Sequence, residues 1–312
     1  MIQKTVIIVC RNESLEDFNQ IARRAHRLDS TVAVIPISEH LHSSLIAKPL
    51  LNLPMLVIFL CNPPDKEFHL AGKLAVEEIS KIKEYEHFKK NHISCLPIEP
   101  FKFGMSLDSS IYGELVVLKP QTIQSTGKDI NMIPTNLIPT LKLEDFPEDH
   151  LIRRDQYYVQ KFVYTGDKPE HYRVLVFLDT VLYIRKNESI FDYPNLNDGL
   201  KSSLSRTVGS NYPRHRKHSM ANDHEIGQFA LKVSATYTKH PIFGVDVVRE
   251  KNTGTLYALE TNPGGNTWHF SSNFTAKMGE DNKLRREQCL KQFNAFDRAA
   301  EALIRKAHEL AK

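Results

Sequence analysis

The segment ALETNPGGNTWH, residues 258–269, places a carboxylate and a carboxamide two residues apart at the end of an apolar stretch. Side chains two apart on a strand point to the same face, so Glu260 and Asn262 direct their oxygen atoms to one place. Oxygen donors of this kind are the ligands that Mg²⁺ prefers in proteins. The spacing therefore predicts part of a metal site, and the surrounding elements must supply the rest.

A hairpin is predicted to supply the third oxygen ligand. Residues 243–262, FGVDVVREKNTGTLYALETN, read as two strands joined by the turn KNTGT. With the turn centred on Thr253, Asp246 lies directly opposite Glu260. Facing carboxylates repel each other, which favours a cation held by Asp246, Glu260 and Asn262. The alternative is a surface hairpin whose carboxylates point into water, and its apolar flanks argue against that.

A lysine followed by a small polar loop suggests an anion site. Residues 113–130, GELVVLKPQTIQSTGKDI, form an apolar strand that ends at Lys119. A lysine at such a strand end either extends its charge into water or binds an anion. The loop that follows contains Ser125, Thr126, Gly127 and Lys128. Its backbone N–H groups could bind phosphate, although a single glycine is a weak signal.

The stretch YRVLVFLDTVLYIRK, residues 172–186, predicts a second hairpin that turns at Asp179. In this register Arg173 and Arg185 face each other across the strands. Two opposed guanidinium groups indicate an anion between or near them. If the two arginines were instead solvated at a sheet edge, they would indicate no anion site. For Arg173 both interpretations stay open.

The elements that must position these residues begin with a parallel sheet. KTVIIVC, TVAVIPI and MLVIFLC are apolar strands within residues 1–65, separated by helical stretches, and this alternation predicts a βαβαβ arrangement. A charged helix over roughly residues 70–91 leads to ISCLPIEPF, whose two prolines indicate a boundary near residue 95. The absence of a Gly-x-Gly-x-x-Gly motif argues against a dinucleotide site there.

The rest of the chain predicts hairpins, longer strands and two helices. Residues 192–220 read as an extended polar loop. NDHEIGQFALKVSATY predicts a helix capped by Asn222 or Asp223, and residues 283–311 predict one charged amphipathic helix.

The order of these motifs resembles the ATP-grasp superfamily, which includes D-alanine–D-alanine ligases, ribosomal-protein glutamate ligases and related carboxylate–amine ligases. The likeness is strongest from Leu115 to Asn262, where a Lys-Pro strand, polar loop, Gln-containing strand, Arg hairpin, Asp strand and Glu-x-Asn strand follow one another. It implies an α/β (α+β) fold with an N-terminal parallel α/β domain, residues 1–95, and an ATP-grasp domain, residues 96–312. The nucleotide would lie between a small subdomain, about 101–165, and a larger one, about 166–312.

The resemblance also implies roles for individual residues. Asp246, Glu260 and Asn262 would hold Mg²⁺, with Mn²⁺ as an alternative ion, against the phosphates of ATP. The catalytic charges would come from Arg185, Lys119 and Arg173. In the family a lysine on the helix before the proline-rich crossover also contacts the nucleotide, and Lys81 matches it, with Lys83 as a competitor. The residues implied to bind ATP are Lys81, Lys119, Ser125, Thr126, Gly127, Lys128, Gln160, Lys161, Phe162, Val163 and Asp167. Within this set, the strand from Gln160 to Val163 resembles the adenine-binding hinge, and Asp167 the ribose-binding acid.

Substrate contacts are expected just after the metal ligands and from a basic stretch. Glycines can let the backbone approach a reacting carboxylate, whereas Trp268 is either a substrate contact or an ordinary core aromatic. Residues 212–219, YPRHRKHS, are either a solvated charge run or, if they fold over the site, a surface for an acidic or phosphorylated substrate. The candidate substrate residues are Gly264, Gly265, Asn266, Trp268, Arg214 and Arg216.

The implied reaction is an ADP-forming ligation. A substrate carboxylate attacks the γ-phosphate of ATP, and an amine then displaces phosphate from the acyl phosphate. Two alternatives stay open. One is an ATP-grasp kinase for a phosphorylated polyol of the inositol phosphate type, which the basic stretch would suit. The other is a regulatory protein that binds nucleotide without turnover, against which the intact Asp–Glu–Asn set argues.

The composition agrees with a cytoplasmic globular enzyme. The 312 residues carry a formal net charge of +4, which suits anionic ligands without indicating nucleic acid. The four cysteines form no Cys-x-x-Cys pair, so neither a zinc knuckle nor a disulfide framework is expected. The longest apolar run is about half of a membrane span. We therefore expect peptide or small-molecule carboxylate and amine substrates, with no nucleic acid or membrane partner, and leave a homodimer open.

Overall fold

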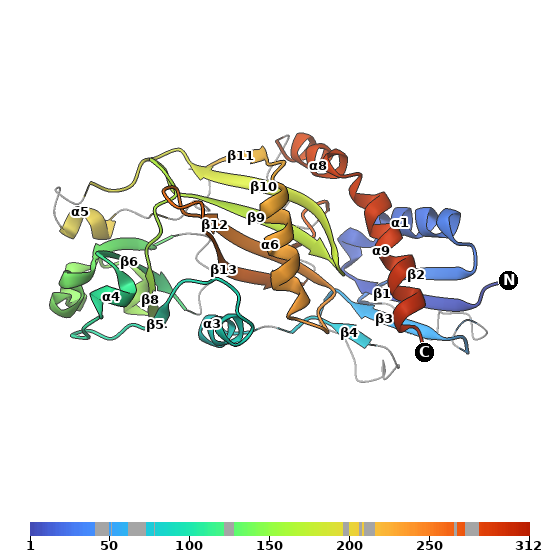
Figure 1. Cartoon of the computed structure of the whole chain (residues 1–312), viewed down its shortest axis with the longest axis horizontal. Helices are drawn as coiled ribbons and strands as arrows, with labels where there is room; N and C mark the ends of the chain where they lie inside the picture. The colour runs from blue at the N-terminus through green and yellow to red at the C-terminus, as the bar shows by residue number, and fades with distance from the viewer. Residues whose placement is uncertain are drawn as a thin grey trace.

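The computed structural model of the chain contains three β-sheets with helices packed against them (Figure 1). The residues it describes are 1–40, 50, 52–61, 73–77, 79–121, 128–195, 200–205, 208, 216–264, 267–271 and 281–312. One sheet is parallel and two are antiparallel, so the chain is a mixed α/β protein, as the sequence predicts. The domain boundaries near residues 95 and 166 stay a prediction.

The N-terminal sheet is parallel and has the strand order β2-β1-β3-β4. Its strands are β1 (Lys4–Cys10), β2 (Val32–Ser38), β3 (Met55–Phe59) and β4 (Lys73–Ala75). The central strands β1 and β3 are buried on both faces, which explains their nearly continuous apolar sequences. The helical stretch HLHSSLIAKPLL falls almost entirely outside the described residues.

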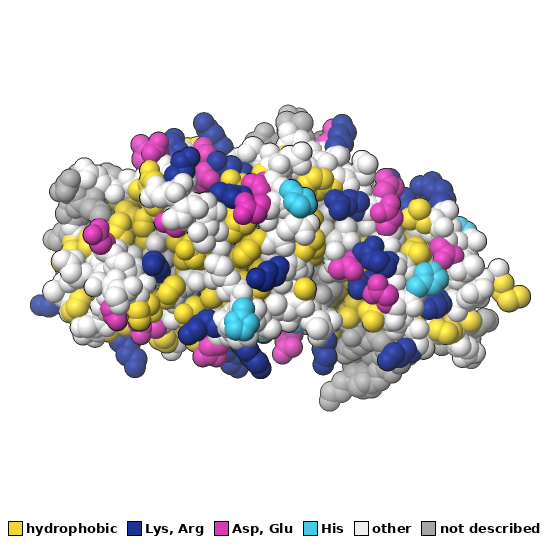
Figure 2. All heavy atoms as spheres, viewed as in Figure 1, with side chains coloured by type: hydrophobic (Ala, Val, Ile, Leu, Met, Phe, Trp, Pro, Cys, Tyr) yellow, Lys and Arg dark blue, Asp and Glu magenta, His cyan; other side chains and the backbone are white. Residues whose placement is uncertain are grey.

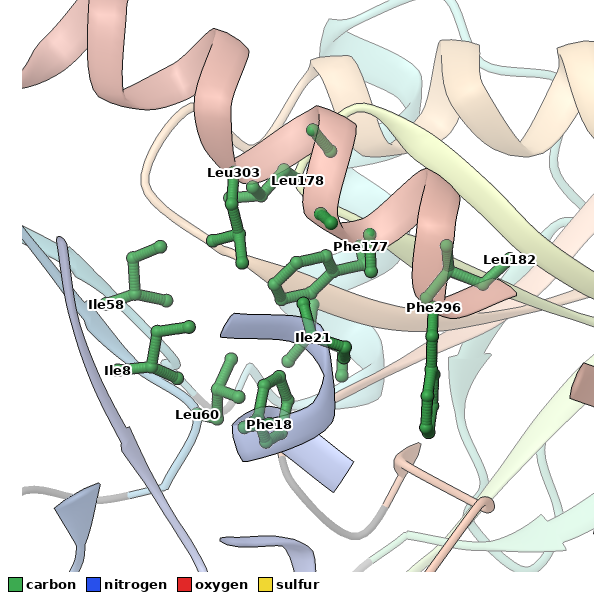
Figure 3. Packing of buried hydrophobic residues seen from close by; sticks show 14 of the residues in the cluster. Ile8, Phe18, Ile21, Ile58, Leu60, Phe177, Leu178, Leu182, Phe296 and Leu303 are labelled. Atoms are coloured by element: carbon green, nitrogen blue, oxygen red, sulfur yellow. The ribbon is translucent and has the colours of Figure 1, made fainter. Parts of the chain in front are cut away.

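Helices from opposite ends of the chain cover one face of this sheet. They are α1 (Leu15–Leu28) and α9 (Ala295–Leu310), which pack against each other. Figure 3 shows their buried cluster, in which Phe18 of α1 lies near Ile8 of β1 and near Phe177, which belongs to the C-terminal half of the chain. The N-terminal sheet therefore shares one apolar core with the C-terminal half of the chain.

Two predicted helices differ in the structure. The helix predicted from about residue 70 begins at Lys81, as α3 (Lys81–Lys90), because Lys73–Ala75 pairs with β3 as a strand instead. The predicted single C-terminal helix is divided into α8 (Asp281–Gln292) and α9. Asn294 between them has a left-handed φ of 53°, a conformation that asparagine tolerates better than most residues.

The second sheet is antiparallel and has the order β5-β8-β6-β7. Its strands are β5 (Ile98–Pro100), β6 (Leu115–Pro120), β7 (Asn131–Pro134) and β8 (Tyr157–Lys161). A separate apolar cluster beneath it includes residues of α4 (Ser109–Tyr112) and α5 (Leu200–Ser205). Lys119 lies near the end of β6, opposite Tyr158 of β8.

The third sheet lies between the other two in Figure 1 and has the order β11-β10-β9-β12-β13. Its strands are β9 (Glu170–Phe177), β10 (Thr180–Ser189), β11 (Arg216–Met220), β12 (Ile242–Arg249) and β13 (Leu256–Pro263). Helix α6 (His224–Ala235) packs on one face. Its cap is Asp223, one of the two predicted residues, whose side chain accepts from the Ile226 N–H at 3.1 Å.

The predicted loop over residues 192–220 is wrong in two places. Leu200–Ser205 forms α5, and Arg216–Met220 forms β11, paired with the end of β10. The sequence RKHSM lacks the apolar alternation that marks a strand, so backbone pairing with an existing edge determines its conformation.

Both predicted hairpin pairs are confirmed. Asp246 faces Glu260, and Arg173 faces Arg185. In each hairpin a register shift lies between the turn and these pairs, so the pairs nearer the turn are offset by one residue from the prediction. Arg173 also faces Asp246 across β9 and β12. Four charged residues therefore form one row across four strands, in the order Arg185, Arg173, Asp246 and Glu260, called the charged row below.

Charged side chains of both signs are interspersed over the face shown in Figure 2. Several pair with one another, as Arg249 does with Asp223 at 2.8 Å and Glu225 at 2.6 Å. Such surface pairs contribute little to stability. Within the described part of the chain, no helix is long and apolar enough to cross a membrane.

Candidate active site

The centre of the charged row is a buried ion pair. Arg173 donates from Nη2 to Asp246 Oδ2 at 2.7 Å, and its Nε donates to the second carboxylate oxygen. Asp246 is only 2% exposed, and burial raises its pKa to about 6 although the Arg173 charge opposes that rise. Burial alone would lower the pKa of Arg173, but the charge and hydrogen bond of Asp246, together with the charge of Glu260, outweigh burial and hold that pKa above its usual range.

A glycine makes room for the Arg173 side chain. A Cβ on Gly244 would lie 3.0 Å from Arg173 Cδ and 2.8 Å from Thr267 Cγ2. These distances are shorter than ordinary van der Waals contact, so a larger residue at Gly244 would displace one of the two side chains. The glycine therefore helps to keep the guanidinium group beside Asp246.

The end of the charged row is paired with a lysine from α3. Lys81 Nζ lies 2.9 Å from Glu260 Oε2 and 3.5 Å from Glu84 Oε2. Burial alone would raise the pKa of Glu260, but the charge and hydrogen bond of Lys81, together with the charges of Arg173 and Lys119, outweigh burial and hold that pKa well below its usual range. Glu260 is therefore ionised at neutral pH. The competitor Lys83 is exposed, so the structure brings Lys81 and not Lys83 to the row.

Glu84, which was not among the predicted site residues, joins α3 to β13, the strand that carries Glu260 and Asn262. Its carboxylate accepts from the Thr261 backbone N–H at 2.6 Å and from the Thr261 hydroxyl. Burial raises the pKa of Glu84, although the Lys81 charge opposes the rise. Glu84 lies three residues after Lys81, and that spacing on one helix face is a signal that could have identified it.

The three predicted metal ligands lie together. Asn262 Nδ2 is 3.2 Å from Asp246 Oδ2 and 3.3 Å from Glu260 Oε1. A half-turn of the carboxamide would present its oxygen to the same point. No cluster of three or more His, Cys, Asp or Glu side chains suited to a metal occurs among the described residues, and this set has two carboxylates and one amide. Three oxygens with phosphate and water completing the shell fit Mg²⁺.

Lys119 approaches the charged row from the second sheet. Its Nζ donates to Gln160 Oε1 at 2.6 Å. Burial lowers the pKa of Lys119 to about 8, although the negative charge of Glu260 opposes that shift. The second and third sheets therefore meet at a place where two lysines and two carboxylates lie close together, which suits the phosphates of a nucleotide.

The predicted adenine hinge lies at the end of β8. The Lys161 N–H donates to the Pro97 carbonyl at 3.0 Å, and the Phe162 N–H donates to the Leu115 carbonyl at 3.2 Å. A base contact with the backbone of Lys161 would therefore use its carbonyl group, with Val163 as the neighbouring candidate.

Two other predicted nucleotide contacts, Asp167 and Lys128, bind neighbouring side chains of the protein. Asp167 is exposed and accepts from the Tyr164 hydroxyl at 3.2 Å. Lys128 Nζ lies 3.4 Å from Asp149 Oδ2, so its charge is directed to a surface carboxylate. The predicted nucleotide contacts Ser125, Thr126 and Gly127 fall outside the described residues.

A chain of hydrogen bonds lies beside the charged row. Asn187 Nδ2 is 2.9 Å from His171 Nε2, and Asn187 Oδ1 is 2.6 Å from His218 Nδ1. Burial lowers the pKa of His171, and burial with the nearby Arg185 charge lowers the pKa of His218 to about 2. Both imidazoles are therefore neutral. His171 lies two residues before Arg173 on the same strand face, a signal that sequence analysis did not use.

Arginines gather at the opposite end of the row from Glu260. Arg185 is 5% exposed, and its Nε has no hydrogen-bond partner among the described residues. Burial, followed by the charges of Arg185 and Arg285, lowers the pKa of Arg216 to about 10. Arg285 comes from α8, which packs on β10 and β11, and nothing local in the sequence identifies it. Arg214 falls outside the described residues.

Trp268 lies in the core, as expected if it is an ordinary core aromatic and not a substrate contact. It is 1% exposed, and its ring lies 4.5 Å from that of Phe18. Its Nε1 donates to Asp17 Oδ2 at 3.0 Å, and Arg286 binds the other oxygen of Asp17 at 2.6 Å. Direct contact between the Trp268 side chain and a substrate is therefore not supported, because the side chain is enclosed.

The segment after the metal ligands is only partly described. Gly264 has a φ of 96°, which favours glycine, and a Cβ there would lie 3.4 Å from Val76 Cγ1. His269 Nδ1 lies 3.2 Å from the hydroxyl of Tyr183. The predicted substrate residues Gly265 and Asn266 fall outside the described residues.

Comparison with known proteins shows that this chain resembles solved structures in its fold. No protein-family model matches the sequence, and the search of curated proteins gave no match. The ATP-grasp ligase PsnB complexed with a minimal precursor matches with a TM-score of 0.50 and 11% identity, over 97% of this chain and 99% of that chain. PsnB complexed with a phosphomimetic precursor variant, Mg and ADP matches with a TM-score of 0.50 and 10% identity, over 98% and 100%.

A Chryseobacterium gregarium RiPP-associated ATP-grasp ligase, in complex with ADP and a leader and core peptide, also matches. Its TM-score is 0.50 at 13% identity, over 98% of each chain. At such identities the likeness concerns the fold, and it extends over nearly the whole chain.

Proposed function

We propose that this chain, which has the ATP-grasp fold, is an ATP- and Mg²⁺-dependent ligase. It would activate a substrate carboxylate as an acyl phosphate and couple it to an amine, with release of ADP. The observation that carries this proposal is the charged row, in which two carboxylates and two arginines lie side by side with Lys81 bound to one end.

The carboxylate end of the row suits the metal and the phosphates. Asp246, Glu260 and Asn262 would hold Mg²⁺, which would supply positive charge to neutralise the phosphates. Lys81 already lies 2.9 Å from Glu260, so a small movement of its side chain would bring it to a phosphate oxygen. Lys119 would approach the same phosphates from the second sheet. The base would lie against the backbone at the end of β8.

The arginine end of the row suits the acid. Arg173 and Arg185 would orient the substrate carboxylate in line with the γ-phosphate and stabilise the charge that develops there. A carboxylate oxygen forms a bond to the γ-phosphorus, and the bond to the leaving oxygen of ADP breaks. The amine nitrogen then attacks the acyl carbon, phosphate leaves, and the nitrogen loses a proton. No side chain of this protein needs to form a covalent intermediate.

Hydroxylamine trapping tests this reaction directly. The protein is incubated with MgATP and pools of peptide and small-molecule acids, and hydroxylamine converts any acyl phosphate to a stable hydroxamate. We expect ADP release that depends on an acid, with a hydroxamate of that acid in mass spectra. A new phosphoester without hydroxamate would identify the kinase alternative. ATP binding without ADP release from any pool would favour the regulatory alternative.

A further inference from the structure

The carboxylates of the charged row are each paired with a cation, whereas Arg185 at the other end of the row has only Arg173 beside it in the row. Asp246 is paired with Arg173, and Glu260 with Lys81. Arg185 lies at the other end of the row, next to Arg173. Its Nε has no hydrogen-bond partner among the described residues although the side chain is 95% buried. A buried guanidinium group with an unsatisfied donor is costly unless a ligand binds it.

Two further arginines converge on Arg185. Alternate residues of β10 point to one face, so Arg185 and Ser189 share it, and Ser189 pairs with Arg216 of β11. Burial lowers the pKa of Arg216, and the charges of Arg185 and Arg285 add to that fall. The three guanidinium groups therefore lie close enough to repel one another.

Helix α8 holds Arg285 in place. Gln292 near its end accepts from the Ile184 N–H at 2.9 Å and donates to the Ala221 carbonyl at 2.7 Å. Arg285 precedes Gln292 by seven residues, about two helical turns, and so lies on the same side of α8. Figure 1 shows α8 beside β10 and β11. The position of Arg285 is thus determined by the packing of the helix.

The neighbouring imidazoles do not add to the positive charge. His218 and His171 are held neutral by burial and by these arginines, and Asn187 orients both through its side-chain amide. Neutral imidazole beside guanidinium groups leaves an environment that binds a compact anion through directed N–H donors.

We propose that the acid substrate carries a second anionic group, a carboxylate or a phosphate, which binds to Arg185, Arg216 and Arg285. This inference rests on the proposed function, because it assumes that the first carboxylate lies beside Arg173 and Arg185, so that Arg185 would contact both anionic groups. Adjacent strands are about 4.8 Å apart, so the two anionic groups of the substrate would be separated by roughly one or two strand spacings.

Anion binding in the absence of ATP tests the inference. Isothermal titration would compare glutarate, inorganic phosphate and the monoanion butyrate on the wild type, Arg216→Gln and Arg285→Gln. We expect glutarate or phosphate to bind at least about 10-fold more tightly than butyrate, and each variant to lose about 10-fold or more of that affinity. The stronger of the two probes identifies carboxylate or phosphate as the second group. Arg23→Gln on α1 is the matched control, since Arg23 is exposed and paired with Glu16 far from the site.

Several outcomes would overturn the inference. Equal affinity for glutarate, phosphate and butyrate would do so, as would no measurable binding of any probe, or the same loss in Arg23→Gln as in the two site variants. Circular dichroism of each variant confirms that it folds. If Arg216→Gln does not fold, Arg285→Gln on helix α8 remains as the test variant. Separate MgATP titrations keep the two proposals distinct, because a failure to bind MgATP contradicts the proposed function regardless of the affinities measured for the anions.

Discussion

The ammonium group of Lys81 lies 2.9 Å from the carboxylate of Glu260. This pair joins α3, which precedes the second sheet, to the last strand of the third sheet. A candidate phosphate-binding lysine thus neutralises a candidate metal ligand. Arrival of the metal and the phosphates would give each of the two a new partner of opposite charge.

The change Glu260→Gln should lower ATP turnover at least about 100-fold, because it removes a charge proposed to hold the metal, and metal binding would contribute several kcal/mol in the transition state. The side chain keeps its shape, and Lys81 keeps Glu84 as a partner, so the melting temperature should change little. Turnover is measured by ADP release with a verified acid. Glu16→Gln on α1, which also removes one acidic charge, should have full activity. Equal activity of the two variants would show that Glu260 holds no catalytic metal.

The change Lys119→Ala should weaken MgATP binding by about 10- to 100-fold, since a hydrogen bond to a charged group contributes about 1.5–3 kcal/mol. Calorimetric titration at pH 7 measures this effect. An unchanged affinity would assign Lys119 to a structural role through its bond to Gln160.

The same lysine predicts a pH dependence. Burial lowers the pKa of Lys119 to about 8, so the side chain is charged below that pH and loses its proton above it. The wild-type affinity for MgATP should therefore fall as the pH rises through about 8, and Lys119→Ala should lack this fall. Lys89→Ala, on the exposed end of α3, should keep it. An identical pH profile in Lys119→Ala would mean that another group titrates.

The change Gly244→Ala should destabilise the protein by about 1–3 kcal/mol, because the added methyl group would overlap Thr267 and the Arg173 side chain. Urea denaturation measures the loss. Gly227→Ala in α6 is the control, since its Cβ would lie 3.4 Å from the nearest atom. Alanine in a helix is favoured over glycine, so this control should be neutral or up to about 1 kcal/mol more stable. A reversed order of the two variants would contradict the predicted packing around Arg173.

The change Glu84→Ala should cost about 1–3 kcal/mol of stability, because it leaves the buried N–H of Thr261 without its acceptor. It should also raise the KM for ATP, since α3 loses one of its attachments to β13 and keeps the pair of Lys81 with Glu260. Glu86→Ala, exposed on the same helix, should change neither quantity. A stability loss with an unchanged KM would separate the structural role of Glu84 from the positioning of Lys81.

The pairs closest in sequence were predictable. Asp246 and Glu260, and likewise Arg173 and Arg185, lie within single hairpins, so turn position and strand alternation predict that they face each other. The motif order from Lys119 to Asn262 likewise predicts the fold, because each motif occupies its own strand. Both kinds of inference depend on interactions between neighbours along the chain, which the sequence encodes directly.

Tertiary structure decided the contacts between distant segments. Glu84 binds Thr261, Trp268 packs on α1, and Arg285 reaches the basic end of the charged row. Strand β11 forms because an edge of the sheet pairs with it, although its own sequence is polar throughout most of its length. Such contacts depend on how sheets and helices pack, and packing is set by the combined burial of many side chains rather than by local periodicity. For this reason the sequence by itself determined which charged residues face each other within each hairpin, whereas only the folded chain decided which charges of distant segments meet.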